Sequence, residues 1–459
     1  MTQRATTAHR SAEQIGHTEL GPRELPAIGE LSKLGVPNHV DTALSNGLRV
    51  VAVRKSNVPM VETRLSIPFG GDSPEHTATA EVLAETVLTG TARRDRVGID
   101  TELALIGGEL NTVVDPEHLV FAGGCLATGL STLLDVLADA LCNASYPDSE
   151  VARESARLVE RLTVARTQPG VLAREALQRR RYGDHPAARE VPQAEYVAAV
   201  DVSDVRALHS RAVIPRGSTL VVVGDIDPQT VVTQLDEALG GWSASGTATE
   251  LAPLPEVVGD DILLVERPGA VQSQIRLSAQ ALPRTDSRYP ALQVANLAFG
   301  GFFSSRLVEN IREDKGYTYG ARSGFEFTPH GATVQVDADT ANEVTAAALL
   351  ETRYELGRLA VVPPSVAEVD AARQYAIGSL LITTSSQSGL AGQLAALTRV
   401  GLGVDWLTGH PERLAAITSE EVASAALDFY APARFTGVVV GDADSLAPQL
   451  AALGGVSRE

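Results

Sequence analysis

The stretch STLVVVGDIDPQTVVTQLDEALGG, residues 218–241, recurs near the end of the chain as FTGVVVGDADSLAPQLAALGG, residues 435–455. Gly224 and Gly441 occupy equivalent places, 441 − 224 = 217 residues apart. In each copy a β-branched run ends in Gly-Asp, and an amphipathic helical pattern follows it. A repeat over this distance predicts that one α/β unit occurs twice in the chain.

The residues upstream of the two copies indicate how each unit is built. Two short strand patterns open each unit, helical patterns and two more strands follow, and long helices come last. The opening strands are expected at residues 47–54, 61–68, 261–266 and 271–278. Strands that precede helices in this way favour an α+β class, with a mixed sheet and helices on one face, over an alternating doubly wound sheet.

Composition shifts set the expected domain boundaries. Residues 1–36 form a polar arm, and residues 37–241 form the N-terminal domain. Residues 242–258 are rich in Ser, Thr and Ala and then punctuated by Pro, which is typical of a linker. Residues 259–459 form the C-terminal domain, so the sequence predicts two homologous sandwich domains joined by a linker.

Charge and cysteine content exclude several functions. The formal net charge of −19 over 459 residues argues against a nucleic-acid partner, because phosphate binding needs a basic face. Cys125 and Cys142 are the only cysteines, so no disulfide framework is expected. The sequence has no apolar stretch of about 18 residues. We therefore expect a cytoplasmic protein without a membrane partner.

The motifs of the first unit point to a family. SNGLRVV at 45–51 precedes TAEVLAETVLTGT at 79–91, a helix and a turn, and LALIGGELNTVV follows at 103–114. In this order the segments resemble the insulinase/pitrilysin/mitochondrial-processing-peptidase family, and the resemblance extends from about residue 37 to the end. It implies two domains that face each other across a cavity. The family's helix carries H-x-x-E-H, in which two His bind zinc and the Glu activates a water molecule.

Alignment with the family on Gly90-Thr91 leaves this chain without the zinc motif. The resemblance places Glu81 and Glu85 at the two His positions, Ala84 at the general base and Arg161 at the third ligand. We expect no metal in this chain, because a cation at a ligand position repels one and Ala84 cannot take a proton. Arg161 would then replace the charge of the metal by pairing with Glu81 or Glu85. The alternative is an acidic helix face that is simply solvated.

The segment LAFGGFFSSRLVENIREDKGYTYGARSGFEF, residues 297–327, keeps the family pattern in the second unit. Gly300 and Gly301 form a flexible turn, Ser304 or Ser305 caps a helix, and Gly316 ends that helix before a strand at 317–327.

In the family, an Arg near this helix end and a Tyr seven residues later grip the substrate and stabilise the developing oxyanion. Arg312 and Tyr319 have this spacing, and Tyr317 competes for the Tyr role. The alternative is that Arg312 pairs with a neighbouring carboxylate, from Glu309 or Asp314, and that Tyr319 packs on a sheet.

Three hypotheses follow. The first is a non-catalytic, substrate-binding subunit of a heterodimeric zinc peptidase, which is not an enzyme on its own. Its partner would carry H-x-x-E-H and zinc, and peptides would be cleaved in a closed chamber. The second is a structural or assembly subunit, similar to core proteins of respiratory complexes. The third is a divergent metallopeptidase that acts alone through Glu81 and Glu85.

Overall fold

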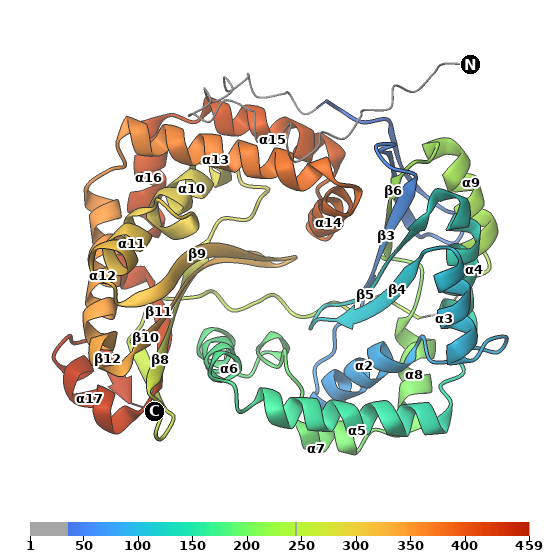
Figure 1. Ribbon diagram of the computed structural model, residues 1–459, viewed down its shortest axis with the longest axis horizontal. Coiled ribbons are helices and arrows are strands. Elements are labelled where there is room, and N and C mark those ends of the chain that lie inside the picture. The colour runs from blue at the N-terminus through green and yellow to red at the C-terminus, as the bar shows by residue number, and fades with distance from the viewer. Residues whose placement is uncertain (1–34, 244–245, 459) are drawn as a thin grey trace, which may run out of the picture. The chain divides into compact units, whose positions relative to one another are not determined.

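The computed structural model describes residues 35–243 and 246–458 (Figure 1). The predicted polar arm, residues 1–36, lies outside the described residues except for its last two positions, and residues 244 and 245 of the predicted linker lie outside them too. Among the described helices, none has the length and apolar character needed to cross a membrane.

Two six-stranded mixed sheets, one in each half of the chain, form the framework. The first has the order β1-β2-β6-β3-β5-β4 and the second the order β12-β7-β11-β8-β10-β9. Strand β2 is parallel to β6, and β7 is parallel to β11 and β12; the other neighbours are antiparallel. The first sheet comprises β1 His39–Ala43, β2 Arg49–Arg54, β3 Met60–Pro68, β4 Glu109–Val114, β5 His118–Leu126 and β6 Thr219–Gly224. The second comprises β7 Ile262–Glu266, β8 Gln272–Ala281, β9 Thr318–Thr328, β10 Gly331–Ala341, β11 Thr436–Gly441 and β12 Val456–Arg458.

The repeated segment supplies equivalent strands of the two sheets. Strand β6 lies between a parallel neighbour, β2, and an antiparallel neighbour, β3. Strand β11 lies in the same way between β7 and β8. The terminal glycines allow close approach here, since a Cβ on Gly224 would lie 2.5 Å from the Met60 carbonyl oxygen. The predicted fold class, two homologous α+β units with mixed sheets, is confirmed.

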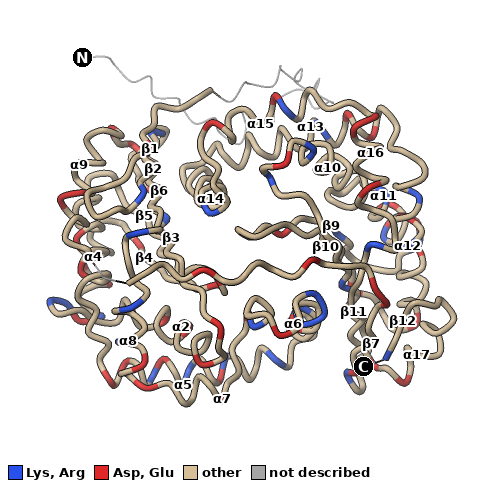
Figure 2. The backbone as a smooth tube through the Cα atoms, turned by 180° about the vertical axis from the view of Figure 1, so that it is seen from behind, with Lys and Arg blue, Asp and Glu red and all other residues tan. Residues whose placement is uncertain are grey.

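Helices follow the strands in each half, as predicted. In the N-terminal half they are α2 Pro74–Thr86, α3 Arg96–Leu105, α4 Leu130–Asn143, α5 Asp148–Ala165, α6 Pro169–Tyr182, α7 Ala194–Ala198, α8 Val202–Ala212 and α9 Pro228–Leu239. In the C-terminal half they are α10 Tyr289–Asn296, α11 Arg306–Val308, α12 Thr345–Val361, α13 Val366–Ser385, α14 Gln387–Thr398, α15 Val404–Ala416, α16 Ser419–Phe429 and α17 Ala443–Ala451. Two π-helical turns, η3 Leu297–Gly301 and η4 Glu309–Asp314, flank α11. The 3-10 turns are η1 Ala127–Gly129, η2 Pro186–Ala188, η5 Asn342–Val344 and η6 Pro432–Arg434. Acidic and basic residues are interspersed over the helices of both halves (Figure 2).

Each half also lends one helix to the sheet of the other half. Helix α14 buries Leu390, Leu394 and Leu397 against β2 and β6 of the first sheet. Helix α6 buries Ala173 and Leu177 against β11 of the second sheet (Figure 1). Adding the repeat offset of 217 residues to Pro169, where α6 begins, gives position 386, next to the first residue of α14. The two exchanged helices are therefore equivalent elements of the two repeats. The prediction of helices on one face only therefore describes each half by itself, because the second face of each sheet is covered by a helix of the other half.

Charged side chains reinforce this exchange. Arg181, at the end of α6, is 5% exposed and contacts Glu326 of β9 at 2.7 Å and the Thr333 hydroxyl at 2.9 Å. Arg399 follows α14 and contacts Asp115, beyond β4, at 3.0 Å. Because burial strengthens such contacts, the two halves are joined by buried polar contacts as well as by the chain between them.

Candidate functional site

Helix α2 carries the first group of predicted site residues. It begins at Pro74, where Ser73 is the N-cap and its hydroxyl accepts a hydrogen bond from the amide of His76 at 3.1 Å. It ends at Thr86, ahead of Gly90-Thr91. The Gly-Thr pair has a structural role in this chain. A Cβ on Gly90 would lie 3.0 Å from the Ser145 hydroxyl, and the Thr91 hydroxyl donates to buried Asp139 at 2.6 Å.

Helices α2 and α5 bring Glu85 and Arg161 together. The Arg161 Nη2 atom lies 2.5 Å from the Glu85 Oε1 atom, although the two residues are 76 positions apart. Both side chains are partly accessible, with 54% of Arg161 and 33% of Glu85 exposed. The ion pair that the alignment predicts between these helices is therefore present. Its interpretation as a substitute for the charge of a metal stays a prediction.

The rest of this group consists of Glu81 and Ala84. Burial, followed by the charge of Glu85, raises the pKa of Glu81 to about 7 against the opposing effect of Arg161. Ala84 is buried, and its carbonyl oxygen accepts a hydrogen bond from the Thr112 hydroxyl of β4. Ala84 thus lies where α2 packs against β4, and its methyl side chain cannot accept or donate a proton.

These residues do not fit zinc. A zinc site needs three protein ligands, such as His, Cys or carboxylate, in addition to an open position. The aligned set offers two carboxylates, and an Arg guanidinium already occupies one of them. Across residues 35–243 and 246–458, no three His, Cys, Asp or Glu side chains are grouped so that they could hold a metal ion.

Arg312 and Tyr319 form the second group, in the other half of the chain. Arg312 lies on η4 and Tyr319 near the start of β9. The guanidinium carbon of Arg312 lies 5.4 Å from the centroid of the Tyr319 ring and 4.8 Å from that of Phe303. The Arg312 Nε atom also pairs with Glu313 at 3.2 Å, rather than with Glu309 or Asp314. The structure thus brings the two predicted residues together.

Exposure separates the two candidate tyrosines. Tyr319 is 92% exposed, so it does not pack on the sheet. Tyr317 is partly buried and packs against the core of the C-terminal half. Only Tyr319 can therefore reach a ligand without breaking core packing.

The loop before α11 has the predicted glycines but not the predicted cap. A Cβ on Gly300 would lie 3.0 Å from Ser323 Cβ, and one on Gly301 would lie 2.9 Å from Asn296 Nδ2. Both glycines therefore permit close packing. Ser305 occupies the N-cap position, but its buried hydroxyl makes no capping hydrogen bond. The helix after it is a single short turn that continues as the π-helical η4.

The two predicted groups lie apart. Helix α2 belongs to the N-terminal half, and α11 and β9 belong to the C-terminal half; α2 and α11 lie on opposite sides of the view in Figure 1. Arg312 and Tyr319 therefore lie in a different half of the chain from Glu81 and Glu85.

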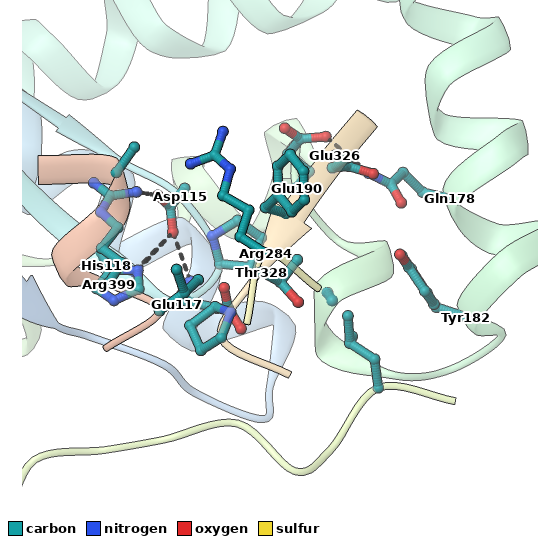
Figure 3. A pocket seen from close by; sticks show the side chains of 17 residues that line it. Asp115, Glu117, His118, Gln178, Tyr182, Glu190, Arg284, Glu326, Thr328 and Arg399 are labelled. Carbon is teal, nitrogen blue, oxygen red and sulfur yellow. Dashed lines mark hydrogen bonds and ion pairs between the residues drawn. The ribbon is translucent and has the colours of Figure 1, made fainter. Parts of the chain in front are cut away.

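The resemblance implies a cavity between the halves, but the place and the lining of the observed cavity were not predicted. About 300 Å³ in volume, it lies where the β4–β5 turn, the end of α6 and the β9–β10 turn converge (Figure 3). Asp115, Glu117 and Glu326 line it together with Arg284 and Arg399. Burial raises the pKa of Glu117 to about 7, with a further contribution from Asp115. No sequence pattern signals this cavity, because two turns far apart in the chain create it.

Comparisons with known proteins agree with this architecture. A family model described as insulinase (peptidase family M16) matches residues 49–195, and one described as peptidase M16 inactive domain matches residues 199–375. Among solved structures, a peptidase M16 inactive domain from Pseudomonas fluorescens has a TM-score of 0.82 at 21% identity, covering 88% of this chain and 98% of that chain. The periplasmic protease PqqL from Escherichia coli has a TM-score of 0.75 at 16% identity, covering 94% of this chain and 50% of that chain.

Curated relatives are named zinc proteases. An uncharacterized zinc protease of Streptomyces coelicolor is 25% identical over 327 residues, 68% of this chain and 71% of the relative. One of Mycobacterium leprae is 27% identical over 300 residues, 63% of this chain and 67% of the relative.

These names overturn the prediction that the chain is not an enzyme on its own. That prediction rested on four positions of α2 and α5, and the loss of one motif at one place does not establish inactivity. The two family models and the shared fold agree on the wider assignment. The chain belongs to the insulinase family, peptidase family M16.

Proposed function

We propose that this chain is the peptide-binding subunit of a heterodimeric zinc peptidase, and that it carries Arg312 and Tyr319 into the active site of a partner with H-x-x-E-H. The observation that carries the proposal is that both side chains present hydrogen-bond donors that are accessible. Tyr319 is 92% exposed, the Arg312 side chain is 32% exposed, and neither terminal nitrogen of Arg312 has a hydrogen-bond or ion-pair partner among the described residues. Their hydrogen-bond donors are thus available to a ligand outside the chain.

The chemistry of the pair suits peptide hydrolysis. A guanidinium presents several fixed donors, and a phenol adds one directional donor. Donors of this kind stabilise the oxyanion that develops on the attacked carbonyl. Zinc at the partner's H-x-x-E-H helix would supply the activated water.

The sheet edge next to the pair provides a surface for an extended peptide. Strand β9 is the last strand of its sheet, so one side of its backbone is unpaired. A peptide that adds as a further strand would bind mainly through its main chain, which favours broad sequence tolerance. Tyr319 lies in this edge strand, close to where such a peptide would pass.

Co-expression with a family member that carries H-x-x-E-H tests the proposal. We expect a stable heterodimer that cleaves an unstructured peptide. In this heterodimer, Arg312→Ala and Tyr319→Phe should each lower kcat/KM by about 10- to 1000-fold, the scale of losing one oxyanion donor.

The matched control is Arg288→Ala. Arg288 lies just before α10, outside β9, its side chain is 60% exposed, and it pairs with Asp286 at 2.9 Å, so its replacement should leave kcat/KM near the unmodified value. Equal kinetics for Arg312→Ala and Arg288→Ala would contradict the proposal. A chain that pairs with no such partner and binds no peptide would instead support the structural or assembly role.

A further inference from the structure

Phe303 is an exposed aromatic residue without a role in the core. It is 59% exposed and lies in the loop between η3 and α11. Its neighbour Phe302 packs against the core of the C-terminal half and stacks on Tyr375 of α13, with ring centroids 5.1 Å apart. Phe302 thus anchors the loop, whereas Phe303 contributes no core packing that would explain it.

The contact that Phe303 does make is with Arg312. The guanidinium carbon lies 4.8 Å from the centroid of the Phe303 ring, closer than it lies to the Tyr319 ring. A guanidinium within about 6 Å of an aromatic centroid is attracted by the ring. Stacking uses the flat faces of the guanidinium, so the N–H groups at its edges stay available.

Two further features fix the position of this contact. The Arg312 Nε atom pairs with Glu313 at 3.2 Å, which orients one edge of the guanidinium. The backbone before Phe303 packs closely, since a Cβ on Gly301 would lie 2.9 Å from Asn296 Nδ2. This packing restrains the backbone of the loop, and the Phe303 ring that the loop carries meets the Arg312 side chain.

We propose that Phe303 is a positioning residue that holds the Arg312 guanidinium in place for the substrate carbonyl. This inference rests on the proposed function of Arg312. A free Arg side chain loses rotamer freedom when it binds a ligand, and an aromatic contact made in advance reduces that loss. Phe303 touches neither substrate nor metal in this scheme, and it acts only through Arg312.

The test uses the full chain, alone and in the heterodimer, with Phe303→Leu and Phe303→Trp. Tyr354→Leu is the matched control, because Tyr354 is a 56% exposed aromatic on α12. The first readout is the Nε–H resonance of Arg312 in the isolated chain, assigned by its loss in Arg312→Ala. We expect Phe303→Leu to move this resonance and Tyr354→Leu to leave it unchanged.

The second readout is kcat/KM of the heterodimer in a double-mutant cycle. Phe303→Leu should lower kcat/KM by about 2- to 5-fold, the scale of one exposed cation–π contact. Phe303→Trp should retain activity, and Phe303→Leu should have no added effect in the Arg312→Ala background. A merely structural role would give the same loss in both backgrounds.

The outcomes separate this inference from the proposed function. An unmoved resonance, or an equal loss of kcat/KM with and without Arg312, overturns the positioning role of Phe303. If Arg312→Ala itself leaves kcat/KM unchanged, the proposed function fails. In that case the resonance alone decides whether Phe303 holds the guanidinium.

Discussion

Replacing Glu81 by Gln should make the stability of the N-terminal half less sensitive to pH. Burial raises the pKa of Glu81 from 4.5 to about 7 in the folded chain. Below pH 4.5 the carboxyl is protonated in both states, so it adds no pH dependence. Between these values the unfolded chain releases the proton and the folded chain keeps it, so the free energy of unfolding falls as the pH rises. Above about pH 7 both states are ionised and the penalty is constant.

The size of the effect follows from the shift. A difference of about 2.5 pH units, at 1.36 kcal/mol for each, corresponds to about 3 kcal/mol. Glu81→Gln removes this penalty. The free energy of unfolding of the variant, relative to the unmodified chain, should therefore rise by up to about 3 kcal/mol from below pH 4.5 to above pH 7. Any cost of burying the Gln amide adds an offset that does not change with pH.

Tryptophan fluorescence provides the assay. The chain has two tryptophans, and Trp242 is 1% exposed within the N-terminal core. In a Trp406→Phe background, Trp242 alone reports urea unfolding of that half at a series of pH values. Glu160→Gln, at an exposed position of α5, is the control for loss of a surface charge. A difference between Glu81→Gln and the unmodified chain that stays constant across the pH series would refute the reasoning.

Three other variants, two single substitutions and one fourfold substitution, test the contacts between elements. Arg161→Met should cost about 0.5 to 1 kcal/mol in urea unfolding, because its pair with Glu85 is partly exposed; a loss of several kcal/mol would contradict this. Arg181→Met should cost about 2 to 3 kcal/mol, because it removes a hydrogen-bond partner of buried Gln178 in α6 and of buried Thr333 in β10. An unchanged unfolding midpoint would argue against a stabilising role of the exchanged helix α6. The combined variant Glu81→His, Ala84→Glu, Glu85→His and Arg161→Glu should bind one zinc ion per chain by metal analysis. Zinc at 100 times its Kd should then stabilise this variant by about 2.7 kcal/mol, whereas a chain that retains no zinc would contradict the alignment of α2 with α5.

The sequence predicted where the strands and helices lie better than it predicted which of them pack together. The repeat around Gly224 and Gly441 identified β6 and β11, because a buried strand followed by a helix leaves a local pattern. An amphipathic pattern shows that a helix has an apolar face but not which sheet it covers, so the exchange of α6 and α14 could not be predicted. The short edge strand β1 was missed because its sequence, HVDTA, is too short and polar to stand out.

Some contacts of the candidate site could likewise be predicted from the sequence, and others could not. The pairing of Arg161 with Glu85 was predicted because a family alignment placed both residues at one site. The contact of Phe303 with Arg312 was missed, since it joins a loop to a helix end and follows no periodicity. The residues that line the cavity between the two hairpin turns were missed for the same physical reason, because they depend on how the two halves dock.

The most direct test of the central claim is photo-crosslinking from position 319 in the heterodimer. With Tyr319 replaced by benzoylphenylalanine, irradiation should join this chain to the partner's segment that contains H-x-x-E-H, or to a bound peptide, as mapped by mass spectrometry. The same group in place of Tyr354, an exposed residue of α12, should give neither product. Crosslinks from position 319 that reach only other copies of this chain would contradict the account.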